Sequence, residues 1–257
     1  MDQHQLSVKQ FGDRAANYLT SSVHATGADL DRLAAVAAEL KLARVLDLGC
    51  GAGHASFALA CGGATRVTAC DPSEDMLNVV RNEATARGHR AVETCVAAAE
   101  ELPFEDRAFD CIVTRYSAHH WASVPRALAE CFRVMVPGGR LIVIDLIAPE
   151  RPLLDTSLQT IELLRDGSHV RSYRVSEWRS MFIAAGFPDP SADTWKRLLE
   201  FQSWVARIGT PLARVEALHE VFAAFPDEVR SYFQINADHD FHTDSAWIEA
   251  VRGAAAV

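Results

Sequence analysis

Five short apolar runs rich in β-branched residues alternate with longer segments of helical period between residues 44 and 146. The runs are RVLDLG (44–49), RVTACD (66–71), VETCVA (92–97), FDCIVT (109–114) and RLIVID (140–145). Each is bounded by Gly, Pro or charge and is apolar enough for burial on both faces, which is typical of parallel strands. Since parallel neighbours need right-handed crossovers, the alternation predicts an α/β, doubly wound sheet.

The segments between the runs carry helix signals. Ser73 can cap a helix whose first turn holds Glu74 and Asp75, and Gly88 can end it. Before the PGG turn, four apolar residues recur at helical spacing: Val124, Leu128, Phe132 and Met135. Ligands of such sheets bind at the carboxyl ends of the strands, so the residues that follow each strand are the candidates for a site.

We expect a single domain, 1–257, in three parts. Residues 1–40 form a helical N-terminal lid, with Phe11, Ala15 and Tyr18 on one face of a first helix. A second helix buries Leu30, Leu33, Ala37 and Leu40. Residues 41–148 form the ligand-binding core. Residues 149–257 form a mostly helical region that covers the substrate, with Ser176 as cap and Gly186 as stop of one helix, and with strands near DTWKRLLEF and SAWIEAV.

Composition excludes several classes of protein. The 257 residues carry a net charge of -9 without a basic run, which opposes nucleic acid as a partner. No stretch approaches the roughly 20 apolar residues of a membrane span, and the amino end does not read as a signal peptide, so we expect a soluble cytoplasmic protein. The six cysteines show no CxxC or zinc spacing, which favours free structural thiols and no metal site. The oligomeric state stays open, a homodimer included.

The loop after the first run has three glycines in alternation, Gly49, Gly51 and Gly53. A dinucleotide fingerprint spaces its glycines G-x-G-x-x-G, and here His54 stands where the third glycine belongs, so the spacing disfavours NAD. S-adenosylmethionine has no phosphate. It needs backbone close to its methionine and ribose portions and an acid near its ammonium group, and Asp47 can supply that acid.

A second acid, Asp71, ends the second run eighteen residues after Gly53, and Pro72 follows it in a tight turn. A carboxylate at this position can accept hydrogen bonds from both ribose hydroxyls. NAD sites share such an acid, so Asp71 discriminates only in combination with the glycine spacing.

With these residues in view, the chain resembles the class I S-adenosylmethionine-dependent methyltransferases, and in particular the ubiquinone/menaquinone biosynthesis (type 11) branch. Four stretches carry the resemblance: VLDLGCGAGH, VTACDPSEDML, AEELPFEDRAFDCIVTRYSAHHW and ECFRVMVPGGRLIVID. It implies a Rossmann-like seven-stranded sheet whose last strand is antiparallel. It also implies S-adenosylmethionine over the glycines, with the ribose on Asp71 and S-adenosylhomocysteine as the product.

The resemblance extends the set of expected cofactor contacts beyond the two acids and the glycines to Tyr18, Cys50, Met76, Ala98, Ala99, Glu100 and Arg115. Tyr18 is either a lid residue over the methionine portion or a core residue of its helix. Ala98 stands where the family often has an Asp that accepts from the adenine amino group, so here backbone groups would have to bind the adenine edge. Glu100 and Glu101 could form a carboxylate pair for acid/base chemistry. Adjacent loop acids are usually solvated, and we interpret these two in that way.

The stretch TRYSAHHW after the fourth run is the candidate chemical site, with Tyr116, His119 and His120 as catalytic candidates. Either histidine can take a proton from an acceptor near neutral pH, or can simply pack the following helix. A D/N-P-P-Y motif, typical of DNA amino-methylating enzymes, is absent here. We therefore expect a small-molecule acceptor, with its pocket walled by Arg165, His169, Arg171 and Trp178.

Three functions remain open on the sequence. The favoured one is methyl transfer from S-adenosylmethionine to a small molecule by direct displacement, without a metal. A protein that binds S-adenosylmethionine without turnover would carry the same cofactor residues. An NAD(P)-dependent oxidoreductase is opposed by the glycine spacing.

Overall fold

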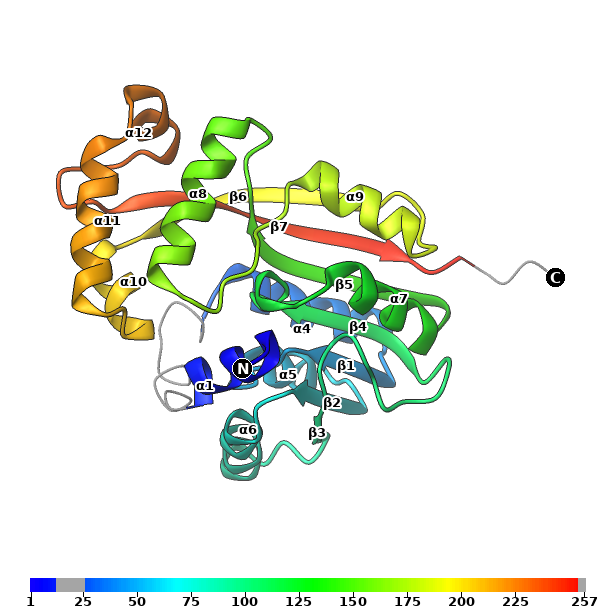
Figure 1. Cartoon of the computed structure of the whole chain (residues 1–257). Coiled ribbons are helices and arrows are strands. Elements are labelled where there is room, and N and C mark those ends of the chain that lie inside the picture. Colours follow the sequence, from blue (N-terminus) through cyan, green and yellow to red (C-terminus); the bar gives the residue numbers. More distant parts are fainter. Residues whose placement is uncertain (13–25, 254–257) are drawn as a thin grey trace.

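A computed structural model describes residues 1–12 and 26–253. Seven strands form one sheet in the order β3-β2-β1-β4-β5-β7-β6, in which β7 is antiparallel to both of its neighbours and the other pairs are parallel (Figure 1). The strands are β1 (Arg44–Leu48), β2 (Arg66–Asp71), β3 (Val92–Val96), β4 (Phe109–Arg115), β5 (Met135–Ile147), β6 (Ser191–Leu199) and β7 (Phe241–Val251). The predicted doubly wound sheet and its antiparallel last strand are confirmed.

Helices cover both faces of the sheet. On one face, α4 (Ala28–Leu40) and α5 (His54–Cys61) pack Leu33 and Leu59 on Val45 and Val113. On the other, α7 (Val124–Val134) and α9 (Val175–Ala184) pack against alternate residues of the same strands, such as Leu46. This division follows from the two-residue period of a strand, which sends successive side chains to opposite faces.

The predicted helix after β2 is α6 (Glu74–Arg87). The Ser73 hydroxyl accepts from the Met76 N–H, and Gly88 ends the helix in the left-handed conformation, as the sequence indicates. Two other boundaries differ from the prediction. Met135 belongs to β5, because α7 ends at Val134. Ser176 lies inside α9 and donates to Glu150, while Arg174 occupies the cap position.

The C-terminal part adds a second apolar cluster beside the sheet. It is built by α8 (Pro152–Arg165), α10 (Phe201–Ile208), α11 (Leu212–Ala224) and α12 (Asp227–Phe233). Figure 1 shows these helices gathered around one end of β6 and β7. Trp204 and Phe222 pack there with Phe241 of β7, so the cluster is anchored to the sheet.

The two N-terminal helices have different positions. In α4 the predicted residues Leu30, Leu33 and Ala37 are buried against the sheet side, while Leu40 is 40% exposed. The first helix, α1 (Gln3–Gly12), instead lies over the carboxyl ends of the strands, next to the pocket described below (Figure 1). A covering role is therefore open to α1 and not to α4.

Candidate functional site

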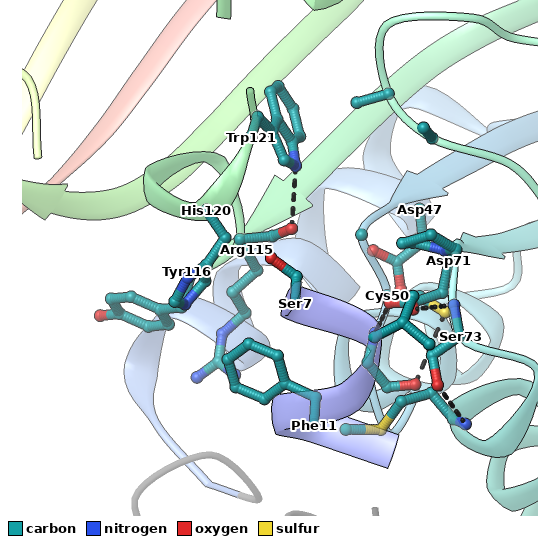
Figure 2. Close-up of a pocket in the computed structure, with 18 of the residues that line it drawn as sticks. Ser7, Phe11, Asp47, Cys50, Asp71, Ser73, Arg115, Tyr116, His120 and Trp121 are labelled. Carbon is teal, nitrogen blue, oxygen red and sulfur yellow. Dashed lines mark hydrogen bonds between the residues drawn. The ribbon is translucent and has the colours of Figure 1, made fainter. Parts of the chain in front are cut away.

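A pocket of about 1030 Å³ opens at the carboxyl ends of β1, β2 and β4, where the strand order reverses (Figure 2). This is where ligands bind in open α/β sheets. The structure brings most of the predicted residues together there. Of the predicted set, the pocket lining includes Asp47, Gly49, Cys50, Gly51, Asp71, Pro72, Met76, Ala98, Ala99, Glu100, Arg115, Tyr116 and His120.

The glycine loop is held close to its neighbours. Gly49 has φ +69°, and a Cβ on it would lie 1.9 Å from the Ser117 Oγ, so no larger residue fits. A Cβ on Gly51 would meet no atom within 4 Å, which leaves the space over this residue open for a ligand. Gly53 lies outside the pocket lining and starts α5 in the left-handed conformation.

Asp71 joins the loop to the end of β2. One carboxylate oxygen accepts from the Gly51 N–H at 2.9 Å, and the other accepts from the Ser73 N–H at 2.9 Å. Burial raises the pKa of Asp71 to about 6, and these two bonds oppose the rise. Each carboxylate oxygen can accept a further bond, so Asp71 keeps capacity for a pair of hydroxyl donors.

Asp47, the acid inside β1, is fully buried. Its Oδ2 accepts from the Ser56 hydroxyl at 2.6 Å, while its Oδ1 has no hydrogen-bond partner among the described residues. Burial raises the pKa of Asp47 to about 6. A buried carboxylate oxygen without a partner is costly, and a cationic ligand group would satisfy it.

The segment after β3 forms another wall. Ala98 and Ala99 line the pocket, and so does Glu100, which is only 7% exposed. The interpretation of Glu100 as a solvated loop acid is therefore wrong, whereas Glu101 is exposed. Glu100 accepts from the Ser123 N–H at 2.9 Å, and its second oxygen lies 3.7 Å from the His4 Nε2.

Arg115, the last residue of β4, and Tyr116, which follows it, line the same pocket. The Arg115 Nε donates to Asp29 of α4 at 2.6 Å, and both side chains are nearly buried. Tyr116 has φ +51°, an uncommon conformation for an aromatic residue, and its hydroxyl donates to the Ser245 Oγ at 3.3 Å. Backbone strain of this kind is concentrated at functional sites.

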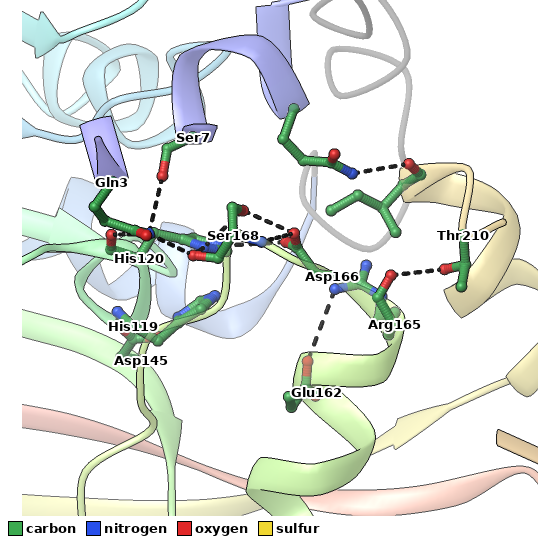
Figure 3. Close-up of polar contacts among 12 residues, drawn as sticks. Gln3, Ser7, His119, His120, Asp145, Glu162, Arg165, Asp166, Ser168 and Thr210 are labelled. Carbon is green, nitrogen blue, oxygen red and sulfur yellow. Dashed lines mark hydrogen bonds and ion pairs between the residues drawn. The ribbon is translucent and has the colours of Figure 1, made fainter. Parts of the chain in front are cut away.

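The two vicinal histidines have different environments (Figure 3). The His119 Nδ1 lies 2.6 Å from the Asp145 Oδ1, and the backbone N–H of His119 donates to the same carboxylate. Burial by itself would lower the pKa of His119, but the Asp145 carboxylate outweighs it and the pKa is raised. His119 lies outside the first pocket and lines a second one beside it.

His120 lines both pockets, and its ring packs edge-on against Phe11 at a centroid distance of 4.8 Å. Its Nδ1 lies 3.2 Å from the Ser168 carbonyl oxygen. Burial, helped by the neighbouring charge of His119, lowers the pKa of His120 to about 4. The two rings are therefore shifted in opposite directions: the pKa of His119 is raised and that of His120 is lowered.

The residues expected to wall an acceptor pocket are only partly brought to it. Arg165 lines the second pocket, but Trp178 is packed in the core under α9. Arg171 is engaged with Asp155 and Glu177, and neither it nor the buried His169 lines either pocket. Tyr18, like Ala15, lies outside the described residues.

Helix α1 contributes residues that the sequence did not single out. His4, Ser7 and Val8 line the first pocket beside Phe11. The Gln3 side chain donates to the carbonyl oxygens of Ser168 and His120 at 2.7 and 3.2 Å (Figure 3). No local pattern reveals these contacts, since the partners lie more than a hundred residues away. Asp145 did have a signal, because it ends the apolar run RLIVID, which belongs to the strand paired in parallel with β4.

The lining fits S-adenosylmethionine, the group that the resemblance implies. The partnerless Asp47 Oδ1 suits an ammonium group, the space over Gly51 admits the ligand, and Asp71 can accept from a ribose diol. A search of residues 1–12 and 26–253 finds no cluster of His, Cys, Asp or Glu able to hold a metal ion, and no helix there could span a membrane.

Comparisons with a family model, with known sequences and with solved structures agree on one family. Residues 46–143 match the family model described as Methyltransferase domain. The uncharacterized protein YafE of Escherichia coli K12 is 45% identical over 188 residues, which are 73% of this chain and 91% of YafE. The uncharacterized methyltransferase YcgJ of Bacillus subtilis is 34% identical over 244 residues, 94% of this chain and 95% of YcgJ. The crystal structure of YcgJ superposes with a TM-score of 0.81 and 31% identity, covering 86% of this chain and 98% of YcgJ.

The quinone-modifying relatives match a shorter segment. The ubiquinone/menaquinone biosynthesis C-methyltransferase of Brucella anthropi is 36% identical over 113 residues, 43% of each chain. The shared segment is thus less than half of either protein.

Proposed function

This chain belongs to the methyltransferase family, and we propose that it transfers the methyl group of S-adenosylmethionine to a small-molecule acceptor by direct displacement. The observation that carries the proposal is the glycine loop under the pocket, with Gly51 tied to Asp71 and open space above it. YcgJ supports it, since the similarity to that methyltransferase runs along nearly the whole of both chains.

Different residues of the first pocket bind different parts of S-adenosylmethionine. Asp71 accepts from the ribose hydroxyls while it holds the loop through Gly51. Asp47 offers its partnerless oxygen to the ammonium group. The backbone at Ala98 and Ala99 takes the adenine edge in place of the missing family carboxylate.

When bound, S-adenosylmethionine supplies a methyl group on a positively charged sulfur. The lone pair of the acceptor forms the new bond to the methyl carbon while the carbon–sulfur bond breaks, and the electron pair of the broken bond stays on sulfur. The protein then has to align the acceptor, exclude water and accept one proton. We assign the last task to His119, because Asp145 contacts its Nδ1 and the Nε2 could take the proton. His120 and Tyr116 form the wall shared by the two pockets.

A protein that binds S-adenosylmethionine without turnover is the second candidate, and the cofactor residues alone do not separate it from an enzyme. The buried His119–Asp145 pair favours the enzyme, because binding of the cofactor in the first pocket does not need it. We also propose a cytoplasmic location, which the free cysteines support, and a small-molecule partner, since the net charge of -9 opposes nucleic acid.

A transfer assay tests the proposal. The purified protein is incubated with tritiated-methyl S-adenosylmethionine and fractionated small-metabolite pools, and labelled product is measured. We expect label in a small molecule, and we expect His119→Gln to lower the rate about 10²- to 10⁴-fold while leaving S-adenosylhomocysteine affinity unchanged. His89→Gln, outside both pocket linings, is the matched control. Cofactor binding without transfer to any pool would favour the binding-only protein.

A further inference from the structure

A second pocket of about 580 Å³ adjoins the first and shares Phe11, Tyr116 and His120 with it. Its other lining residues are His119, which follows β4, and residues of β5, α8, β6, α10 and β7. Since the shared wall consists of Phe11 of α1 and of Tyr116 and His120, which follow β4, a molecule in this second pocket would lie next to a cofactor in the first.

The charge of this second pocket is opposite to that of the protein. Three arginines line it, Arg165 from α8, Arg197 from β6 and Arg207 from α10, in a chain whose net charge is -9. Among the described lining residues the single acid is Glu162, whose pKa burial raises while Arg165 opposes the rise. Cations from three separate elements that converge on one cavity create a local positive field.

Aromatic rings hold two of the arginines in place. The Arg165 guanidinium lies over the Trp204 ring at 5.2 Å, and its Nε donates to the Trp204 carbonyl oxygen at 3.0 Å. Arg165 also pairs with Glu162 at 3.8 Å (Figure 3). The Arg197 guanidinium lies 4.7 Å from the centre of the Tyr116 ring. Stacking fixes the plane of a guanidinium, and a planar guanidinium matches the geometry of a carboxylate or phosphate group.

Apolar side chains make up another part of the lining, namely those of Phe11, Leu146, Leu199 and Trp204, and Thr243 and Ser245 add hydroxyl groups. A ligand that satisfies both parts has an anionic group at one end and an apolar or aromatic body.

We propose that the methyl acceptor is an anionic small molecule whose carboxylate or phosphate binds in the arginine-lined second pocket. This inference rests on the proposed function and adds the chemical class of the acceptor. Ion pairing at one end fixes the orientation of the molecule, so that its nucleophilic atom lies beside His119 at the other end. The proton of that atom passes to the imidazole as the methyl bond forms.

Binding of four probes tests this class. Benzoate and phenyl phosphate are the anionic probes, and benzamide and benzyl alcohol are their neutral counterparts. Each is titrated into the full chain saturated with S-adenosylhomocysteine, at low and at high salt. We expect at least one anion to bind about tenfold or more tightly than its neutral counterpart, and we expect added salt to weaken it. The preferred anion then distinguishes a carboxylate from a phosphate ligand.

The variants Arg197→Gln and Arg207→Gln should each lower the affinity for the preferred anion about tenfold and leave S-adenosylhomocysteine binding unchanged. Arg179→Gln is the charge-matched control, since Arg179 is 49% exposed on α9 and outside both pockets. A second measurement is the behaviour of the labelled product of the transfer assay, which should be retained on an anion-exchange resin.

The inference is overturned if a sample that binds S-adenosylhomocysteine binds the anions no better than the neutral probes, or does not bind the anions. A labelled product without negative charge would also overturn it. A sample that does not bind S-adenosylhomocysteine would instead overturn the proposed function.

Discussion

Replacement of Asp71 by Asn removes one buried negative charge at the end of β2 without changing the size of the side chain. In the structure both carboxylate oxygens are used, one by the Gly51 N–H and the other by the Ser73 N–H, each at 2.9 Å. An amide can accept from only one of these donors, and its NH₂ group faces the other. The variant therefore loses its charge toward the ribose and also disturbs the loop under the cofactor.

The expected loss follows from one charge-assisted hydrogen bond. Such a bond contributes about 1.5 to 3 kcal/mol, so S-adenosylhomocysteine should bind roughly 10- to 150-fold more weakly to Asp71→Asn. Isothermal titration measures the affinity, and thermal unfolding verifies that the variant is folded. Asp75→Asn is the control, because Asp75 lies in the first turn of α6, is exposed and is outside the pocket lining. Equal affinities of Asp71→Asn, Asp75→Asn and the wild type would refute the role of Asp71.

The other predictions concern pH and access. The rate of methyl transfer should fall as the pH falls through the pKa of His119, which Asp145 holds above the usual 6.5. In Asp145→Asn the midpoint of this pH-rate profile should move to lower pH. A profile that the substitution leaves unchanged would exclude His119 as the base. Asp47 and Asp71 have pKa values raised to about 6, so each contributes stability that is present below about 3.8 and is lost as the pH rises through 6. Since an ammonium group favours ionised Asp47, S-adenosylhomocysteine should bind more tightly as the pH rises from roughly 5 to 7, and titration should show this dependence weakened in Asp47→Asn. Hydrogen exchange of α1 should be fast without ligand and slowed by S-adenosylhomocysteine, and Gln3→Ala, which removes the bonds to Ser168 and His120, should speed it further; full protection of α1 without ligand would indicate plain packing.

The fold of the core was predictable because its signals are local. The five apolar runs, the cap at Ser73 and the glycine at Gly88 each act within a few residues, and the structure confirms them. The errors came where tertiary packing decides. Ser176 looks like a cap, but the Glu177 side chain accepts from the Arg174 N–H and starts α9 earlier. The sequence predicts that Glu100 is a solvated loop acid, yet its carboxylate contacts His4 of α1 and the Ser123 N–H.

The candidate site divides in the same way. The residues that follow β1, β2 and β4 could be placed at one edge of the sheet, because parallel strands bring their carboxyl ends together. The choice between His119 and His120 depends on Asp145, which lies 26 residues along the chain from His119. The arginine-lined pocket combines α8, β6 and α10, and no spacing in the sequence relates Arg197 to Arg207 across that distance.

The central claim is that the pocket over the glycine loop binds S-adenosylmethionine, and parallel isothermal titrations of the wild-type chain with S-adenosylhomocysteine and with NAD test it most directly. The structure predicts saturable binding of one S-adenosylhomocysteine per chain and no binding of NAD under the same conditions. Saturable binding of NAD, with no heat from S-adenosylhomocysteine, would contradict it.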